Sequence, residues 1–305
     1  MITQTNIGKA LLAILLMWIF SSEIIAQTAN KPIRKKNYID SITTTEEVLN
    51  LIRSIEPKLR FQPASMQTDM YDFCKQLRKS NQTPDWMRAD IDQNGLSDIV
   101  IADKWNILVI LAQSNSYRIE TIKTGMYQCM IADIHKNKIR YRLYSQKKNN
   151  VGQPDTHYLV YKYGGIVDEN PLPSKHRITK ISYSTSRCHG KCAVFELQID
   201  DTKQATLKAI ADNRVDDKLL DGAYSTIIKE KDYQQIIDLL NYMNFEQLNA
   251  SYYPGLKDAQ QATLTITYDN GKIKTITDNG MNATQSLTYL HRLLFDLRKN
   301  QDWKK

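Results

Sequence analysis

The spacing of apolar residues predicts two helices near the start of the chain. Val48, Leu51, Ile52 and Ile55 recur at helical intervals, Thr43–Thr45 can cap the first turn, and Pro57 ends the pattern. Residues 66–79 show a second helical stripe. The apolar pattern then changes to short strand-like runs separated by turn residues, which predicts six strands: Ile99–Ala102, Ile107–Leu111, Tyr117–Ile122, Cys129–Ile134, Ile139–Tyr144 and Tyr158–Tyr163. Residues 43–166 are therefore expected to form an N-terminal module of two helices and an antiparallel meander.

A second patterned region follows residues 167–177, a polar stretch with two prolines that we interpret as a linker. Its expected strands are Ile178–Tyr183, Ala193–Ile199, Ala205–Ile210 and Leu219–Ile228. An amphipathic helix around residues 233–240 comes next, then a hairpin over 263–277 with Asn270-Gly271 at its turn, then a closing helix over 287–297. The chain is therefore expected to be α+β, with two modules that each pack helices on an antiparallel sheet, the second over 178–300, and a tail over 301–305.

The first 26 residues resemble a secretory signal peptide. Lys9 precedes an apolar run over 10–20 that is too short to span a bilayer, and Ala26 offers a cleavage point. Residues 27–42 are then expected to be a flexible leader. No later segment is long and apolar enough to be a transmembrane helix, so we expect an exported protein that is periplasmic or secreted. In that compartment disulfide bonds form readily.

Composition narrows the function classes. The chain has 305 residues, 42% of them hydrophobic and 24% charged, which excludes fibrous and wholly disordered classes. The 41 Lys and Arg exceed the 33 Asp and Glu, so the formal net charge is +8. The basic residues are scattered in short pairs rather than gathered on one face among aromatic residues, so a nucleic-acid partner is not expected.

An acidic loop at residues 90–98 is the first candidate site. It fits the spacing D-x-D-x-N-G-x-x-D, which places carboxylate and amide oxygens on alternate positions around a turn, as calcium requires. The predicted ligands are the side chains of Asp90, Asp92, Asn94 and Asp98 and the carbonyl of Leu96. This loop is similar to the calcium loops of FG-GAP and VCBS-type β repeats. The alternative is a plain β-turn whose polar side chains bond their own backbone.

The segment Cys188-His189-Gly190-Lys191-Cys192 is the second candidate site, because it lies between two expected strands. Three interpretations remain open: a local disulfide, a Cu(I) or zinc site that uses both thiolates and His189, and a redox-active pair. Redox pairs usually open a helix, whereas this one leads into a strand. The other two cysteines, Cys74 and Cys129, are either small buried apolar residues or a second disulfide.

The segment 178–298 contains a series of motifs that recur together. They are the strand Ile178–Tyr183, the Cys188/Gly190/Cys192 turn, Gly222-Ala223-Tyr224, Lys231-Asp232-Tyr233, Asn244-Phe245, the strand Thr263–Thr267 and Lys274–Asp278. With these features the segment resembles the domain of unknown function 6438 family of exported bacterial proteins. The chain departs from the family pattern after the second cysteine, where Ala193 and Phe195 replace proline and tyrosine. The resemblance implies export and fold, and it implies no chemistry.

No catalytic motif stands out in the sequence. A nucleophile elbow, phosphate-binding glycine motifs and paired histidine ligands are all missing. Tyr252 and Tyr253 form a candidate binding loop, or else a packed turn. The leading hypothesis is a non-enzymatic binding or interaction protein of the cell envelope, stabilised by Ca²⁺, whose partner is an envelope protein or a glycan. The alternatives are a thiol-redox or copper-handling protein that uses Cys188 and Cys192, and a hydrolase built from loop carboxylates.

Overall fold

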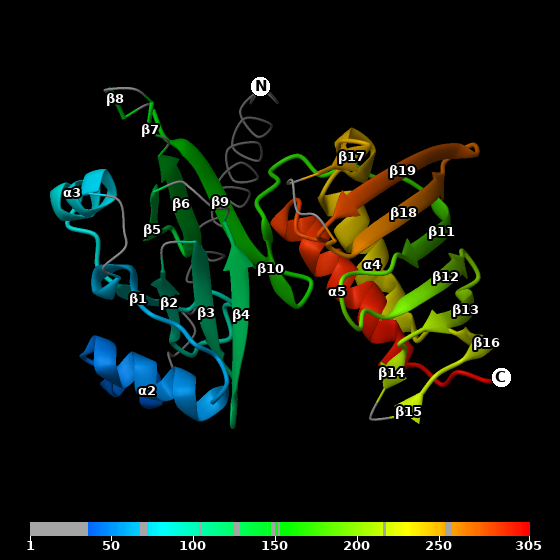
Figure 1. Ribbon diagram of the computed structural model, residues 1–305, viewed down its shortest axis with the longest axis horizontal. Helices are drawn as coiled ribbons and strands as arrows, with labels where there is room; N and C mark the ends of the chain where they lie inside the picture. The colour runs from blue at the N-terminus through cyan, green and yellow to red at the C-terminus, as the bar shows by residue number, and fades with distance from the viewer. Residues whose placement is uncertain are drawn as a thin grey trace, which may run out of the picture.

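The computed structural model describes residues 36–305 except 68–71, 104, 125–128, 145, 148–149, 152, 216–217 and 254–257 (Figure 1). The expected signal peptide and most of the expected leader lie outside the described residues. No helix in the described part of the chain is long and apolar enough to cross a membrane. Strands and helices are mixed along the chain, which confirms the α+β class.

The N-terminal region, residues 36–168, contains two four-stranded sheets and the first helices. Its helical elements are η1 (Tyr38–Ser41), α2 (Thr45–Ile55), η2 (Ala64–Met66) and α3 (Asp72–Ser80). The first sheet has the order β1-β2-β3-β4, formed by Trp86–Ala89, Asp98–Ala102, Asn106–Ala112 and Tyr117–Lys123. The second has the order β10-β9-β6-β5, formed by Gly165–Asp168, Asp155–Lys162, Lys138–Tyr144 and Cys129–His135. A small ribbon pairs β7 (Gln146–Lys147) with β8 (Asn150–Val151).

The predicted single meander is wrong, because its strands divide between two sheets that pack face to face. Strand β2 shows why, because both of its faces are buried. Ile99 and Ile101 pack against α2, whereas Val100 and Ala102 pack against the second sheet. The continuous apolar run Ile99–Ala102 is typical of a strand buried on both faces, but it does not identify which segments form the second layer.

The start of the described chain corrects another expectation. Residues 37–42 belong to the predicted flexible leader, yet Asn37 caps η1, and Ile39 and Ile42 are buried in the core beside α2. Helix α2 begins as expected: Thr44 and Glu47 form a capping box, and the N–H groups of Thr43 and Thr44 lower the pKa of Glu47 to about 2. The second predicted helix corresponds to α3, whereas Met66, where it was expected to begin, ends η2.

The C-terminal region, residues 169–305, is built on one seven-stranded sheet with the order β16-β13-β12-β11-β18-β19-β17. These strands are Gly222–Ile227, Gln204–Ala211, Val194–Asp200, Ile178–Thr185, Gln261–Tyr268, Lys272–Asn279 and Ser251–Tyr252. All neighbouring pairs are antiparallel except β17 and β19, which are parallel. The predicted strand over 219–228 is two elements, because β15 (Lys218–Leu219) pairs with β14 (Arg214–Val215) and β16 joins the main sheet.

Two helices cover one face of the seven-stranded sheet. They are α4 (Glu230–Tyr242) and α5 (Gln285–Asn300), with η3 (Phe245–Gln247) after α4. Leucines along α5 and apolar residues of α4 pack on the inward side chains of β11, β12, β13 and β18. The predicted hairpin over 263–277 is present as β18 and β19, with Gly271 at φ +86° in its turn. The last residues pack on the edge strand, where Lys304 and Ser225 exchange backbone hydrogen bonds of 2.8 and 2.9 Å.

The two regions meet where α5 lies against β10, as Figure 1 shows in the middle of the molecule. The side chain of Asp168 accepts the backbone N–H (2.8 Å) and the hydroxyl (2.9 Å) of Ser286. Val167 belongs to the C-terminal core although it falls in the predicted linker. Gly165 is required here, because a Cβ atom at this position would lie 2.6 Å from ring atoms of Tyr289.

Candidate functional site

The acidic loop connects β1 to β2, so its two ends are held by a strand pair. Asp90 directly follows β1, and Asp98 is the first residue of β2. Ligand atoms of Asp90, Asp92 and Asp98 lie within 4.8 Å of one another. Within the described residues this is the one group of three or more histidine, cysteine or acidic side chains that converges in this way. The structure thus brings three of the five predicted calcium ligands together.

Asp98 is the most constrained of the three carboxylates. It is 0% exposed, and it accepts hydrogen bonds from the backbone N–H groups of Ile91 (2.7 Å) and Ala112 (2.8 Å) and a longer one from Asp92 (3.4 Å). Burial nevertheless raises the pKa of Asp98 to about 7, and the nearby carboxylate of Asp92 adds to the shift. Burial also raises the pKa of Asp92. The loop therefore gathers three carboxylates whose burial raises two of their pKa values, although backbone N–H groups and the positive charge of Arg118 oppose these shifts.

The side chain of Asn94 turns its amide nitrogen, and not its oxygen, toward Asp92. The Nδ2 of Asn94 donates to Asp92 Oδ2 (3.0 Å) and to the carbonyl of Ala112 (2.7 Å), and its Oδ1 accepts the N–H of Leu96 (2.8 Å). A cation that used Asn94 would require its amide to rotate so that oxygen replaces nitrogen. Leu96 packs its side chain on the core under α2.

The loop also shows the features of a plain turn. Gly95, at φ +87°, donates its N–H to Asp90 Oδ2 (3.0 Å), and the N–H of Asn94 reaches Asp92 Oδ1 (3.2 Å). One carboxylate oxygen of the loop lacks a donor: Asp90 Oδ1 is buried and has no hydrogen-bond partner among the described residues. A buried carboxylate oxygen without a donor is costly, and a cation would satisfy it.

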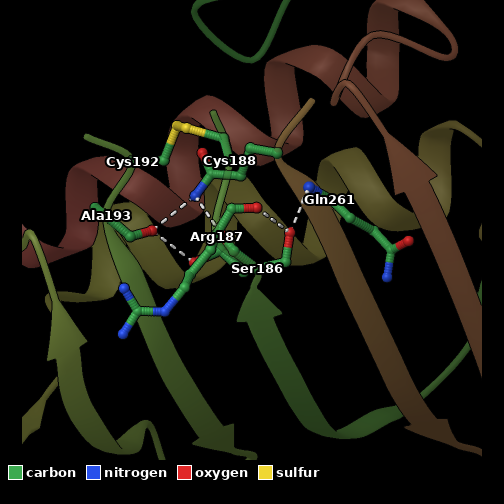
Figure 2. Close-up of a disulfide and its surroundings, with 8 residues drawn as sticks. Ser186, Arg187, Cys188, Cys192, Ala193 and Gln261 are labelled. Atoms are coloured by element: carbon green, nitrogen blue, oxygen red, sulfur yellow. Dashed lines mark hydrogen bonds between the residues drawn. A yellow bond between two sulfur atoms is a disulfide. The ribbon is translucent and has the colours of Figure 1, made fainter. Parts of the chain in front are cut away.

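Cys188 and Cys192 form a disulfide across the turn between β11 and β12 (Figure 2). Their Cα atoms are 5.8 Å apart. The turn is fixed to the neighbouring segment: Gln260 Nε2 donates to the carbonyls of Ser186 (3.1 Å) and Ala193 (2.7 Å), and the N–H of His189 donates to the carbonyl of Asp258 (3.0 Å). This disulfide therefore stabilises a tight, partly exposed turn at the end of the sheet.

The surroundings of this disulfide differ from those of a redox pair. Neither cysteine lies at a helix N-terminus, where the helix dipole would stabilise a thiolate. In Figure 2 the side chain of Arg187 extends away from the sulfur atoms. His189 is exposed, and the two sulfur atoms are bonded to each other, so the three predicted ligands of a Cu(I) or zinc site are not free together.

Cys74 and Cys129 form a second disulfide, which is the alternative to two separate buried thiols. It joins α3 to β5 with a Cα separation of 5.3 Å, and both residues are buried beside Ile131 and Tyr144.

The two tyrosines of the candidate binding loop differ in their exposure to solvent. Tyr252 packs on the C-terminal core and accepts the N–H of Asn249 (3.1 Å), whereas Tyr253 is 67% exposed. Pro254 and Gly255, which complete that predicted binding loop, lie outside the described residues.

Two further polar groups were not indicated by any pattern in the sequence. The first is buried in the C-terminal core, where His291 Nε2 lies 3.2 Å from Asp278 Oδ2 and its Nδ1 lies 3.1 Å from the hydroxyl of Tyr183. Burial raises the pKa of Tyr183 well above its usual value. The second is a cleft of about 840 Å³ between the two regions, lined by Arg118, Glu120 and Arg292 among others. Both join residues that are distant in sequence, so no local motif could have indicated them.

Comparison with known proteins supports the C-terminal assignment. Residues 179–298 match the family model described as Domain of unknown function (DUF6438), which confirms the resemblance predicted for this part of the chain. The match contains the Cys188–Cys192 turn and the Tyr183, Asp278 and His291 group, and it excludes the acidic loop. No curated protein and no solved structure matches the chain.

Proposed function

We propose that the protein is an exported, non-enzymatic binding or interaction protein of the bacterial cell envelope, whose N-terminal region is stabilised by one calcium ion. The signal-like N-terminal sequence and the two disulfides support export, because disulfides persist in oxidising compartments. The compartment would be the periplasm or the cell exterior.

One observation carries the calcium part of the proposal. Asp90, Asp92 and Asp98 converge in a loop held at both ends by strands, and Asp90 Oδ1 has no donor among the described residues. Calcium binds six to eight oxygen atoms on flexible loops, and it would offset the cost of holding these carboxylates close together and partly buried. A structural role is proposed because the loop ties β1 to β2 and, through Asp98 and Asn94, to the end of β3.

The test is calcium titration by calorimetry together with thermal unfolding with and without calcium. Calcium should bind with one site per chain and raise the midpoint of unfolding, since a ligand that binds only the folded state stabilises it. Asp92→Asn should abolish both effects. Asp72→Asn is the matched control, because that carboxylate is exposed on α3 and remote from the loop, and it should respond to calcium like the parent chain. Unfolding that is the same with and without calcium would contradict the proposal.

The alternative is a thiol-redox or copper-handling role for Cys188 and Cys192. The partial exposure of this disulfide is the feature that favours it. A redox titration followed by thiol labelling and mass spectrometry separates the two roles. A reduction potential below about −300 mV is typical of structural disulfides, whereas a more oxidising value or copper bound to the reduced pair would support the alternative.

A further inference from the structure

The cleft between the two regions has the position and chemistry of a ligand site. It has a volume of about 840 Å³, and its walls come from β4 and β9 on one side and from α4 and α5 on the other. Clefts of this size between separately packed layers are where proteins most often bind small ligands. No motif in the sequence pointed to it, because the two walls come from segments far apart along the chain.

The floor of the cleft is a fixed ionic group. Glu120 is 2% exposed and accepts hydrogen bonds from both terminal nitrogens of Arg292, of which Nη2 lies 3.0 Å from Oε1. The Nε of Arg118 lies 3.3 Å from the same carboxylate, and its Nη2 donates to the carbonyl of Gly164 (2.9 Å). Two arginines held by one buried glutamate cannot turn freely, so their outward edges are pre-organised donors.

A second contact group fixes the distance between the walls. The hydroxyl of Tyr289 donates to the carbonyl of Tyr163 (2.6 Å) and accepts from Gln235 Nε2 (2.8 Å). The ring of Tyr289 lies directly on Gly165. The cleft is therefore held open by packed contacts between the two regions.

The charges on the walls exclude a strongly charged ligand. Helices α4 and α5 present three aspartates, whereas the floor and α4 supply three cations. The carboxylates are Asp232, Asp238 and Asp296, and the cations are Arg118, Lys231 and Arg292. A polyanion would meet the aspartates and a polycation would meet the arginines, and like charges at close range cost binding energy.

The same side chains suit a neutral ligand with many hydroxyl groups. Carboxylates accept hydrogen bonds and guanidinium groups donate them, and both kinds of side chain line the cleft. Gln234 orients the acceptor Asp238, since its Nε2 donates to Asp238 Oδ1 (2.8 Å). Tyr161 and Tyr163 add half-buried aromatic rings, which present apolar faces next to polar tips. Sugars combine hydroxyl groups with apolar C–H faces, and they need both kinds of contact.

We infer that this cleft binds a neutral oligosaccharide. The inference rests on the proposed binding function and names the class of its ligand. The ligand would lie along the helix wall, with its hydroxyl groups on Asp238, Asp296 and the outward edge of Arg292. Its apolar face would contact the part of the Tyr161 side chain that Arg118, whose Cζ lies 5.9 Å from the ring centroid, does not cover.

The experiment uses the full mature chain with four probes: maltohexaose, cellohexaose, mannohexaose and chitohexaose, each titrated at millimolar concentration by calorimetry and by saturation-transfer NMR. A hexagalacturonate is the anionic comparator. At least one neutral probe should bind, and Asp238→Ala should weaken it about tenfold or more, because the lost acceptor leaves sugar hydroxyls unpaired. Gln198→Ala, on the open face of the seven-stranded sheet, is the matched control and should bind like the parent chain.

Binding of no neutral probe, preference for the hexagalacturonate, or unchanged binding in Asp238→Ala would each overturn the inference. Thermal unfolding of every variant, with and without calcium, is measured on the same preparations. A chain that is stabilised by calcium but binds none of the saccharides would retain the proposed calcium-stabilised role and lose only the oligosaccharide site.

Discussion

Asp98 in the N-terminal region and Asp278 in the C-terminal region are both 0% exposed, yet they are balanced in different ways. Asp98 accepts only backbone N–H groups, and its closest ionisable neighbours are other carboxylates. Asp278 accepts the backbone N–H of Ala283 (3.1 Å) and lies 3.2 Å from His291 Nε2. Backbone amides are neutral donors, whereas a histidine can also supply a positive charge.

The difference lies in the kind of partner that each carboxylate has. In the C-terminal region Asp278 Oδ2 lies beside His291, which belongs to the helix α5 that fills the core, while Asp278 Oδ1 has no hydrogen-bond partner among the described residues. In the N-terminal region Asp98 has only backbone donors, and burial raises its pKa. Three carboxylates converge in the acidic loop, whereas Asp278 lies beside a histidine, so the acidic loop, and not the Asp278 group, is the calcium candidate.

The two disulfides provide the largest test of this contrast between regions. Cys74→Ala/Cys129→Ala should lower the free energy of unfolding by about 4 kcal/mol, and Cys188→Ala/Cys192→Ala by about 2 kcal/mol, as measured by urea denaturation. The reason is loop length: the first pair spans 55 positions and the second only 4, so the first restricts the unfolded chain far more. Equal losses would show that the exposed turn contributes to folded-state packing as strongly as the buried pair.

Removal of the Asp278 carboxylate, the partner of His291 in the C-terminal core, should have the next largest effect on the free energy of unfolding. Asp278→Ala leaves His291 Nε2 buried without its acceptor and should cost about 3 kcal/mol of unfolding free energy. Thr275→Ala is the matched control, because it lies exposed on the same strand and should change stability by less than about 0.5 kcal/mol. If the two variants were equally stable, Asp278 would not need His291, and the comparison of the two aspartates would fail.

The smallest expected effect, taken per pH unit, is a pH dependence that belongs to the acidic loop. The carboxyl of Asp98 has a pKa of about 7 in the folded chain, raised by burial, against about 4 when unfolded. Between these values the folded state binds more protons than the unfolded state. The free energy of unfolding should therefore fall as pH rises from about 4 to about 7, by about 1.4 kcal/mol per pH unit between these values, and then level off.

Chemical denaturation at a series of pH values, with and without calcium, measures this slope. Excess calcium should flatten it, because the cation replaces the proton as the neutralising group. Asp98→Asn should also flatten it, since the amide does not titrate. A slope that persists in Asp98→Asn would assign the pH dependence to another carboxyl and would remove the electrostatic argument for the acidic loop.

Much of the fold was predictable from local patterns. The alternation of apolar and polar residues over 178–183 and 263–277 identified strands of the seven-stranded sheet, and Asn270-Gly271 identified the turn of its hairpin. The capping residue Thr44 and the apolar stripe that follows identified α2. These signals are local, because a turn or a helix start depends on a few neighbouring residues.

The arrangement of the sheets was not predictable in the same way. The sequence shows that Val100 and Ile101 are both apolar, but the partners that cover them belong to different layers. For the same reason, nothing near Val167 reveals that it fills the C-terminal core. Packing across layers is a property of distant segments, and a period of two along one strand carries no information about it.

The sequence by itself determined the α+β class, the acidic spacing from Asp90 to Asp98 and the short cysteine turn, because each depends on residues that are close along the chain. Tertiary structure alone decided that Cys74 pairs with Cys129, that Asp278 has His291 as its partner, and that Arg118, Glu120 and Arg292 form the floor of one cleft. Those groups are assembled by burial, which brings together charges and rings from distant segments only when the whole core forms.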